Sequence, residues 1–315
     1  MTKATSGVSA RLTILAAAAL FSTGGAAIKA CQLNAWQVAS FRSGVAAVFL
    51  VLAWRGVTGW RERRVWLVGL AYAATMVLYV VANKLTTAAN SIFLQSTAPL
   101  YVMLIGPWLI GETIRRRDLL LSLLLAIGLA TFFVGVEPPL ATAPDPRLGN
   151  LVGAASGLTW ALTLIGLRWL GRQPGGEAHG GGAVIVGNLL ACLICLSAAL
   201  PVVSTRPLDA ALIGYLGVGQ IGLAYVLLTR GLGRVPAIEA SLLLLLEPVL
   251  NPLWSWIVHH EQPGGWSLAG GALILTATLA HVAGSSRVAS RQDGGGRGDV
   301  SCSKPDSSGP GRPNR

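Results

Sequence analysis

The chain has 315 residues, of which 53% are hydrophobic and only 12% are charged, and its formal net charge at pH 7 is +11. An ordinary soluble domain carries about a quarter charged residues, so this composition leaves too few charges to cover a water-facing surface. It excludes a soluble globular domain and predicts an integral membrane protein.

Ten apolar stretches follow one another between short polar breaks. A helix needs roughly 20 mostly apolar residues to cross a bilayer, and these stretches lack the alternation of barrel strands. Helices then satisfy every backbone hydrogen bond in hydrocarbon. The sequence therefore predicts an all-α integral membrane protein with ten transmembrane helices, at about residues 12–30, 36–54, 65–82, 88–110, 119–136, 149–169, 183–201, 208–228, 237–258 and 266–284.

The first stretch has a second interpretation as a cleaved secretory signal. Lys3 and Arg11 precede an apolar run from Leu12 to Phe21, and small residues follow. Cleavage would leave nine spans and would break the charge pattern and the duplication described below. We therefore expect the first helix to be retained.

The basic residues gather in alternate loops. With the N-terminus inside, the cytoplasmic loops and their edges hold Arg55, Arg61, Arg63, Arg64, Arg115, Arg116, Arg117, Arg168, Arg172, Arg230 and Arg234. The opposite loops hold only Lys84, Arg147 and Arg206. Because Lys and Arg in short loops stay on the cytoplasmic side, we expect a multi-pass protein of the cell membrane with both termini in the cytoplasm.

The C-terminal segment 287–315 is basic and rich in Gly, Ser and Pro. Such a composition cannot build a packed core, so it predicts a disordered cytoplasmic tail. A basic tail of this kind touches anionic membrane lipid. Nucleic-acid binding is the rival interpretation, but the placement of the charge favours lipid, and we expect no nucleic-acid partner.

An internal repeat appears when residues 86–112 are placed on residues 235–261, a shift of 149 residues. The shift aligns Ala88 with Ala237, Leu94 with Leu243, Pro99 with Pro248, Leu104 with Leu253 and Glu112 with Glu261. Each match falls in the fourth span of a five-span half, which divides the chain into 1–143 and 144–286. Because five is odd, the two halves must be inverted relative to each other, as in many secondary transporters.

The chain resembles the EamA-type proteins of the drug/metabolite transporter superfamily. The resemblance covers nearly everything except the tail and depends on Lys29 at the end of span one and on an ordered set of segments: FRSGVAAVFLVL, AANSIFLQSTAPLYVMLIGPWLIGE, GNLVGAASGLTWAL, LGVGQIGLAY and AIEASLLLLLEPVLNPLWSWIVHHE. The family's glycines nine and sixteen residues beyond the glutamate are kept singly, as Gly128 in the first half and Gly270 in the second. The resemblance implies an exporter of a small metabolite, such as an amino acid, organic anion or drug-like compound, working by alternating access.

Three charged residues in the predicted spans stand out: Lys29, Arg42 and Glu247. A charge in hydrocarbon costs at least about 2.5 to 3.5 kcal/mol, so such residues usually face the bundle interior and serve function. We predict that all three bind substrate and that Glu247 takes up a proton as the coupling ion. The alternatives are that Glu247 pairs with Lys29 or Arg42 to fix helix packing, and that Lys29 snorkels to the interface.

Further polar and aromatic residues could contact a small ligand. The predicted substrate-binding set adds Asn90, Gln95, Trp160, Gln220, Tyr225 and Asn251. Their alternative role is interhelical hydrogen bonding and packing. Pro99 and Pro248 each remove a helical hydrogen bond and are predicted helix breaks.

The aligned glutamates Glu112 and Glu261 lie at helix C-termini, where a negative charge opposes the helix dipole. Local helix stability therefore does not explain them. We predict a gate or structural role for both. The nearby cations that could hold them are Arg115, Arg116, Arg117, His259 and His260.

The sequence offers no catalytic constellation, no metal-spaced histidine cluster and no phosphate-binding loop, so we expect no enzyme activity, no metal and no cofactor. The expected partners are a small-molecule substrate and membrane lipid, and the sequence does not predict the oligomeric state. A different class of protein, a membrane receptor or scaffold that keeps the fold without net flux, is the alternative function.

Overall fold

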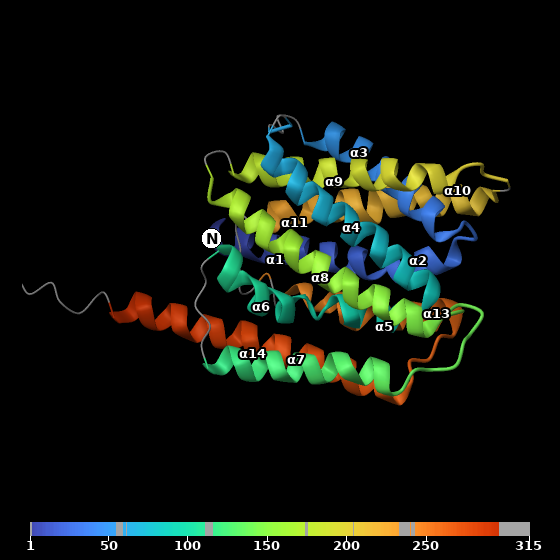
Figure 1. Ribbon diagram of the computed structural model, residues 1–315. Helices are drawn as coiled ribbons and strands as arrows, with labels where there is room; N and C mark the ends of the chain where they lie inside the picture. The colour runs from blue at the N-terminus through green and yellow to red at the C-terminus, as the bar shows by residue number, and fades with distance from the viewer. Residues whose placement is uncertain are drawn as a thin grey trace, which may run out of the picture.

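The computed structural model describes residues 2–54, 59–60, 62–110, 116–173, 176–203, 205–232, 240 and 243–295, and in this part of the chain it contains helices and no named strand (Figure 1). The all-α prediction is confirmed for these residues. The named helices are α1 (Thr2–Ser22), α2 (Gly24–Ala30), α3 (Ala35–Ala53), α4 (Arg63–Leu85), α5 (Ala88–Gln95), α6 (Ala98–Ile110), α7 (Arg116–Val134), α8 (Pro146–Gly171), α9 (Gly176–Ala199), α10 (Pro207–Gly214), the π-helix η1 (Tyr215–Leu223), α11 (Ala224–Leu232), α13 (Leu246–His259) and α14 (Gly265–Gly295).

Seven stretches of the described chain are long and apolar enough to cross a membrane: Ala10–Ala30, Ala35–Ala53, Arg63–Leu85, Ala88–Leu109, Pro146–Gly171, Ala178–Ala199 and Pro207–Gly231. Two shorter apolar helices cover Leu119–Val134 and Gly265–Ala280. The predicted ninth span, 237–258, lies partly outside the described residues, and α13 covers its second part. Ten crossings and an inverted repeat thus stay predictions.

The predicted span 88–110 contains a break close to Pro99, because Ser96 and Thr97 interrupt the helix between α5 and α6. Pro99 has no N–H to donate to the carbonyl of Gln95, and its ring crowds that carbonyl. The Ser96 and Thr97 hydroxyls instead donate to the carbonyls of Ile92 and Leu94, at 2.7 and 2.6 Å. Each of these two carbonyls accepts a hydroxyl in addition to a backbone N–H.

The second half has a break at the matching place. Leu245 is a turn residue, and α13 starts at Leu246 with Pro248 in its first turn. Ser96 and Leu245 are separated by the same 149 residues that align the two halves. The first predicted span is interrupted as well, at Thr23, so that α2 is a separate short helix that carries Lys29.

Helix α14 continues to Gly295, into the predicted tail 287–315, whose disorder stays a prediction. Residues 281–293 contain no proline and several good helix formers. Residues 296–315 of the predicted tail lie outside the described part of the chain.

Helices α7 and α14 lie side by side (Figure 1) and pack through two glycines. A methyl group on Gly270 would stand 2.8 Å from the carbonyl oxygen of Gly128, and one on Gly128 would stand 3.2 Å from that of Gly270. Small residues let membrane helices approach this closely. The single glycine kept by each half therefore meets its counterpart from the other half.

Substituting Gly270→Leu will destabilise the protein by about 1–3 kcal/mol or more, because the two helices must separate to admit the side chain. Gly265→Leu on the same helix is the matched control, since nothing lies within 4 Å of a Cβ at Gly265. Unfolding temperatures of the detergent-purified variants check this. Equal temperatures for the two variants would contradict close packing at Gly270.

Candidate functional site

Among the charged side chains of the described residues, that of Arg42 on α3 is the most buried, at 1% exposed. One guanidinium nitrogen, Nη2, donates to the backbone carbonyl of Met76 on α4 at 3.0 Å, while Nε has no partner. No acidic side chain of the described residues forms an ion pair with Arg42. A guanidinium carries five N–H donors, so most of its hydrogen-bonding capacity is unused.

Glu247 lies in the first turn of α13, is half-buried, and makes no hydrogen bond or ion pair with the described residues. The turn break at Leu245 places the Glu247 carboxyl at a helix N-terminus, where the helix dipole favours a negative charge. The alternative that Glu247 pairs with Lys29 or Arg42 is wrong, because Lys29 contacts Glu261 and Arg42 contacts Met76.

Three tyrosines lie near Arg42, and two of them also lie near Glu247. Tyr79 and Tyr225 are each close enough to both Arg42 and Glu247 for electrostatic interaction. The Tyr72 and Tyr225 rings meet edge to face, with centroids 6.0 Å apart. We call Arg42, Tyr72, Tyr79, Tyr225 and Glu247 the central cluster.

Two asparagines donate hydrogen bonds to tyrosine hydroxyls of the central cluster. Asn251, fully buried on α13, donates to the Tyr79 hydroxyl at 3.1 Å, and Asn188 of α9 donates to the Tyr72 hydroxyl at 3.3 Å. The Oδ1 atom of Asn251 has no partner and faces Gly25 of α2, where a Cβ would stand 2.6 Å away. The cluster therefore touches the short helix that carries Lys29.

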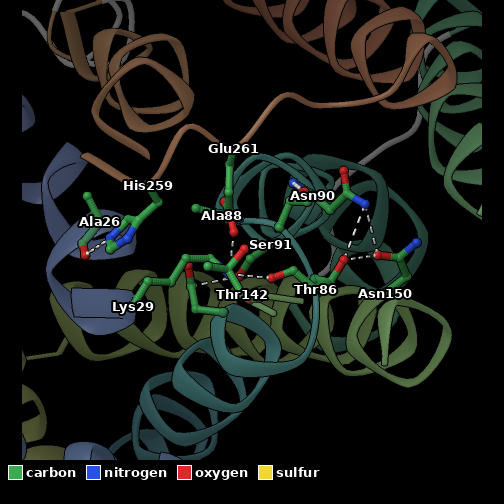
Figure 2. A network of polar contacts seen from close by, with 12 residues as sticks. Ala26, Lys29, Thr86, Ala88, Asn90, Ser91, Thr142, Asn150, His259 and Glu261 are labelled. Atoms are coloured by element: carbon green, nitrogen blue, oxygen red, sulfur yellow. Dashed lines mark hydrogen bonds and ion pairs between the residues drawn. The ribbon is translucent and has the colours of Figure 1, made fainter. Parts of the chain in front are cut away.

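A second polar site lies at the end of the bundle where α2 and α13 end and α5 begins (Figure 2). Lys29 Nζ is 2.8 Å from Glu261 Oε1, and the two side chains are only 2% and 3% exposed. Lys29 also donates to the carbonyls of Thr86 and Thr142. Glu261 Oε2 accepts the backbone N–H of Ala88, the first residue of α5, at 3.0 Å. We call this ion pair with its backbone partners the latch.

The partner of Glu261 in the structure differs from the cations that the sequence suggested. His260 ends α13 in the left-handed conformation, at φ 55°, and this turn directs Glu261 away from its own helix. Its carboxylate faces the N-terminus of α5, where the dipole favours it. The predicted cation His259 instead places Nε2 2.8 Å from the Ala26 carbonyl. Lys29 supplies the positive charge.

Asn90 belongs to a network beside the latch (Figure 2). Its Nδ2 donates to Thr86 Oγ1 and Asn150 Oδ1, both at 3.2 Å. Asn150, which is buried on α8, also accepts from Thr86 Oγ1 at 2.8 Å and donates to the carbonyl of Phe132 on α7 at 2.7 Å. These bonds join α5, α7 and α8 near the latch and not at the central cluster.

The other predicted residues lie apart from the central cluster or have other partners. Gln95 donates to Ser156 on α8 at 2.9 Å, beside the break in span four. Gln220 lies on the π-helix η1 and donates to the Phe21 carbonyl at 3.4 Å. Trp160 is half-buried on α8, and Glu112 lies outside the described residues.

The structure adds Tyr72, Tyr79 and Asn188 to the site, none of which the sequence singled out. The signal for the first two was their position on span three. Tyr72, Met76, Tyr79 and Asn83 follow one another at spacings of four, three and four residues, which places them on one face of a helix. A polar face of this kind in an apolar helix turns toward the bundle interior.

Comparison with known proteins shows where the chain has relatives. The sequence pattern of the EamA-like transporter family matches it twice, over residues 8–134 and 147–282. A pseudopaline exporter, CntI, from two strains of Pseudomonas aeruginosa is 26% identical over 268 residues, covering 82% of this chain and 91% of the exporter. A crystal structure that is 23% identical covers 86% of this chain and 97% of its own, with a TM-score of 0.58, and so shares the fold.

Proposed function

This chain belongs to the EamA-like transporter family and is a multi-pass membrane transporter rather than an enzyme. We propose that it exports a small metabolite across the cytoplasmic membrane by alternating access. The outward direction is supported by the Pseudomonas aeruginosa relatives, which are named as exporters. Both termini then lie in the cytoplasm, as the distribution of arginines indicates. The latch is at the outer end.

The observation that carries this proposal is the pair of helix breaks at Ser96 and Leu245. Discontinuous helices in corresponding positions of two halves are the best structural pointer to a transporter's binding site. Here one break precedes Pro99 and the other lies two residues before Glu247 of the central cluster. Each half thus supplies one broken helix.

The helix contacts support two halves built alike. Helix α4, in the predicted third span, packs on α8, which is the sixth. Helix α11, in the eighth span, packs on α1 of the first. In the same way, α3 of the second span packs on α9 of the seventh, and α7 of the fifth span packs on α14 of the tenth. Exchanging each span for the one five positions along leaves these pairings unchanged, as a two-fold repeat requires.

We propose that the central cluster, with Asn251, binds substrate and that the latch is the outer gate in its closed state. Asn90, Gln95 and Gln220 are assigned to helix packing by their hydrogen bonds to other helices. Glu247 is the candidate for proton coupling, because its carboxyl is half-buried and unpaired. Lys29 acts through the gate and not as a ligand to substrate.

Comparing the metabolites released by cells with and without the gene tests the export function. We expect at least one small metabolite to accumulate inside the cells that lack it. The purified protein in proteoliposomes should then move that metabolite. Equal release from both cell lines, together with no flux in proteoliposomes, would contradict export.

Deleting residues 296–315 separates a transporter from a receptor that signals through its basic tail. The deletion leaves α14 intact to Gly295, so we expect the transport rate in proteoliposomes to stay within about twofold of the full chain, as surface changes usually have small effects. If the truncated protein still folds but the cells lose the phenotype that the full chain gives them, the receptor is favoured.

A further inference from the structure

We propose that a groove between α3 and α9 binds one acyl chain of an anionic phospholipid, and that Arg63 binds the phosphate of the same lipid. None of the residues that line this groove belongs to the central cluster or to the latch, so the inference goes beyond the transport function. It follows from the shape of the groove, from the tryptophan at one end of it, and from the charge beside that tryptophan.

The groove lies where α3 and α9 pack side by side (Figure 1), and it has a volume of 240 Å³. Its floor is formed by Ala47 of α3 and Ile185 of α9, which are 6% and 1% exposed. Its rims are exposed aliphatic side chains, namely Val48, Val51, Leu52 and Leu189. A small alanine among larger side chains leaves a hollow, and a hollow with apolar walls accepts apolar ligands and not water.

The shape of the groove favours a hydrocarbon chain over a helix. One turn before Ala47, a Cβ on Gly44 would stand 3.0 Å from Cys192 Sγ, and Ser40 donates to the Cys192 carbonyl at 2.8 Å. The two helices therefore touch there and leave no room for a ligand. One turn of a helix, about 10 Å wide and 5.4 Å long, is too large for the remaining space, whereas part of an acyl chain fits it.

Trp60 lines the groove at the end where α3 leads into α4, and it is 38% exposed. The indole N–H of the exposed Trp66 donates to the Trp60 carbonyl at 2.8 Å, which holds the two tryptophans together. Tryptophan is enriched at the boundary between hydrocarbon and water. This end of the groove therefore lies at the level of the lipid headgroups, and the aliphatic part extends into the hydrocarbon.

Arg63 places a positive charge at the headgroup end. It begins α4 three residues after Trp60, and three residues span at most about 11 Å. Its side chain is exposed and makes no hydrogen bond or ion pair with the described residues. The one acidic residue of the sequence 54–64, Glu62, lies with Oε1 3.2 Å from Nε2 of His179. A guanidinium matches a phosphate geometrically, and basic sites between membrane helices bind anionic headgroups.

Tryptophan fluorescence tests the site on the full chain in phosphatidylcholine nanodiscs. A minor fraction of lipid with a brominated acyl chain is added, either as phosphatidylglycerol or as phosphatidylcholine, because bromine quenches a tryptophan that it contacts. Subtracting the signal of Trp60→Phe isolates Trp60 from the ten tryptophans of the chain. We expect brominated phosphatidylglycerol to quench Trp60 at about one-fifth of the mole fraction that brominated phosphatidylcholine needs, the ratio that one arginine contributes at an anionic surface.

Two substitutions, each with a matched control, locate the lipid. Arg63→Gln should lower the preference for phosphatidylglycerol about fivefold, and Arg147→Gln, which removes an exposed arginine at the start of α8, should leave it unchanged. Ala47→Leu fills the floor and should reduce quenching of Trp60 by both brominated lipids. Ala53→Leu, at an exposed position at the end of α3 that does not line the groove, should not reduce it.

Equal quenching of Trp60 by the two brominated lipids in the wild-type protein overturns the proposal, as does a preference that survives Arg63→Gln. Unchanged quenching in a folded Ala47→Leu protein overturns the position of the chain. A dimeric protein in which neither lipid quenches Trp60 has its groove covered by a second copy, which also overturns the proposal. Arg63 is exposed, so the headgroup test stands even if Ala47→Leu does not fold. No readout here is a flux, so failure of this site is distinguishable from failure of the proposed export.

Discussion

Either Lys29→Met or Glu261→Gln alone will abolish transport and destabilise the protein by roughly 3–5 kcal/mol, because each leaves its partner as an unpaired buried charge. The double variant will be more stable than either single one. It buries no unpaired charge, and a glutamine at position 261 still offers an oxygen to the Ala88 N–H. Unfolding temperatures of the four proteins form the double-mutant cycle that measures the pair.

Reversing both charges will not restore stability, which distinguishes the latch from a simple ion pair. Lys29 donates to the carbonyls of Thr86 and Thr142, and Glu261 accepts from a helix N-terminus. A carboxylate at position 29 would face two carbonyl oxygens, and an ammonium at position 261 would face the positive end of α5. A fully stable Lys29→Glu/Glu261→Lys variant would contradict the geometry described for the latch.

The neutral double variant also reports on gating. If the latch closes the outer end, its loss shifts the protein toward the outward-open state. A cysteine at Ser91, buried one turn into α5, should then react with a membrane-impermeant maleimide from outside faster than in the wild-type background. Unchanged labelling would show that the pair holds the fold without gating it.

Glu247→Gln will make transport independent of pH and will lower its rate by about tenfold or more, since it removes both a proton acceptor and a ligand. The groups that face Glu247, Tyr79 and Tyr225, are tyrosines with an ordinary pKa of about 10, so they offer no substitute that titrates near neutral pH. Flux into proteoliposomes across imposed pH gradients measures this.

The matched control for Glu247 is Glu62→Gln, because Glu62 is 46% exposed and pairs with His179 away from the central cluster. It should leave the pH dependence as in the wild type. Wild-type rate together with wild-type pH dependence in Glu247→Gln would exclude this carboxyl from coupling.

The sequence predicted the helices and the key charged residues because both follow from the free energy of placing a chain in the hydrocarbon of a membrane. Apolar length identifies helices, and the expense of a charge in hydrocarbon identifies Arg42 and Glu247. It missed the latch because sequence spacing does not give helix rotations or the direction of a turn. Glu261 is far from Lys29 in the sequence, and only the left-handed His260 turns it toward α5.

The break in span four was partly visible in the sequence. Pro99 indicated a weakened helix, but a single proline often only bends a membrane helix, because other groups satisfy the freed carbonyl. At the interruption, the Ser96 and Thr97 hydroxyls donate to carbonyls at the end of α5. Tyr72 and Tyr79 were missed because tyrosine in a span is commonly an interfacial residue, and only tertiary packing shows that it faces inward.

The arrangement of two oppositely oriented halves is the claim on which the transport mechanism depends. Single cysteines at position 112, in the first half, and at the exposed His260, in the second, test it in a cysteine-free background on intact cells. With two inverted halves, an impermeant reagent labels position 260 from outside and position 112 only after the membrane is permeabilised. Labelling of both positions from the same side would contradict it.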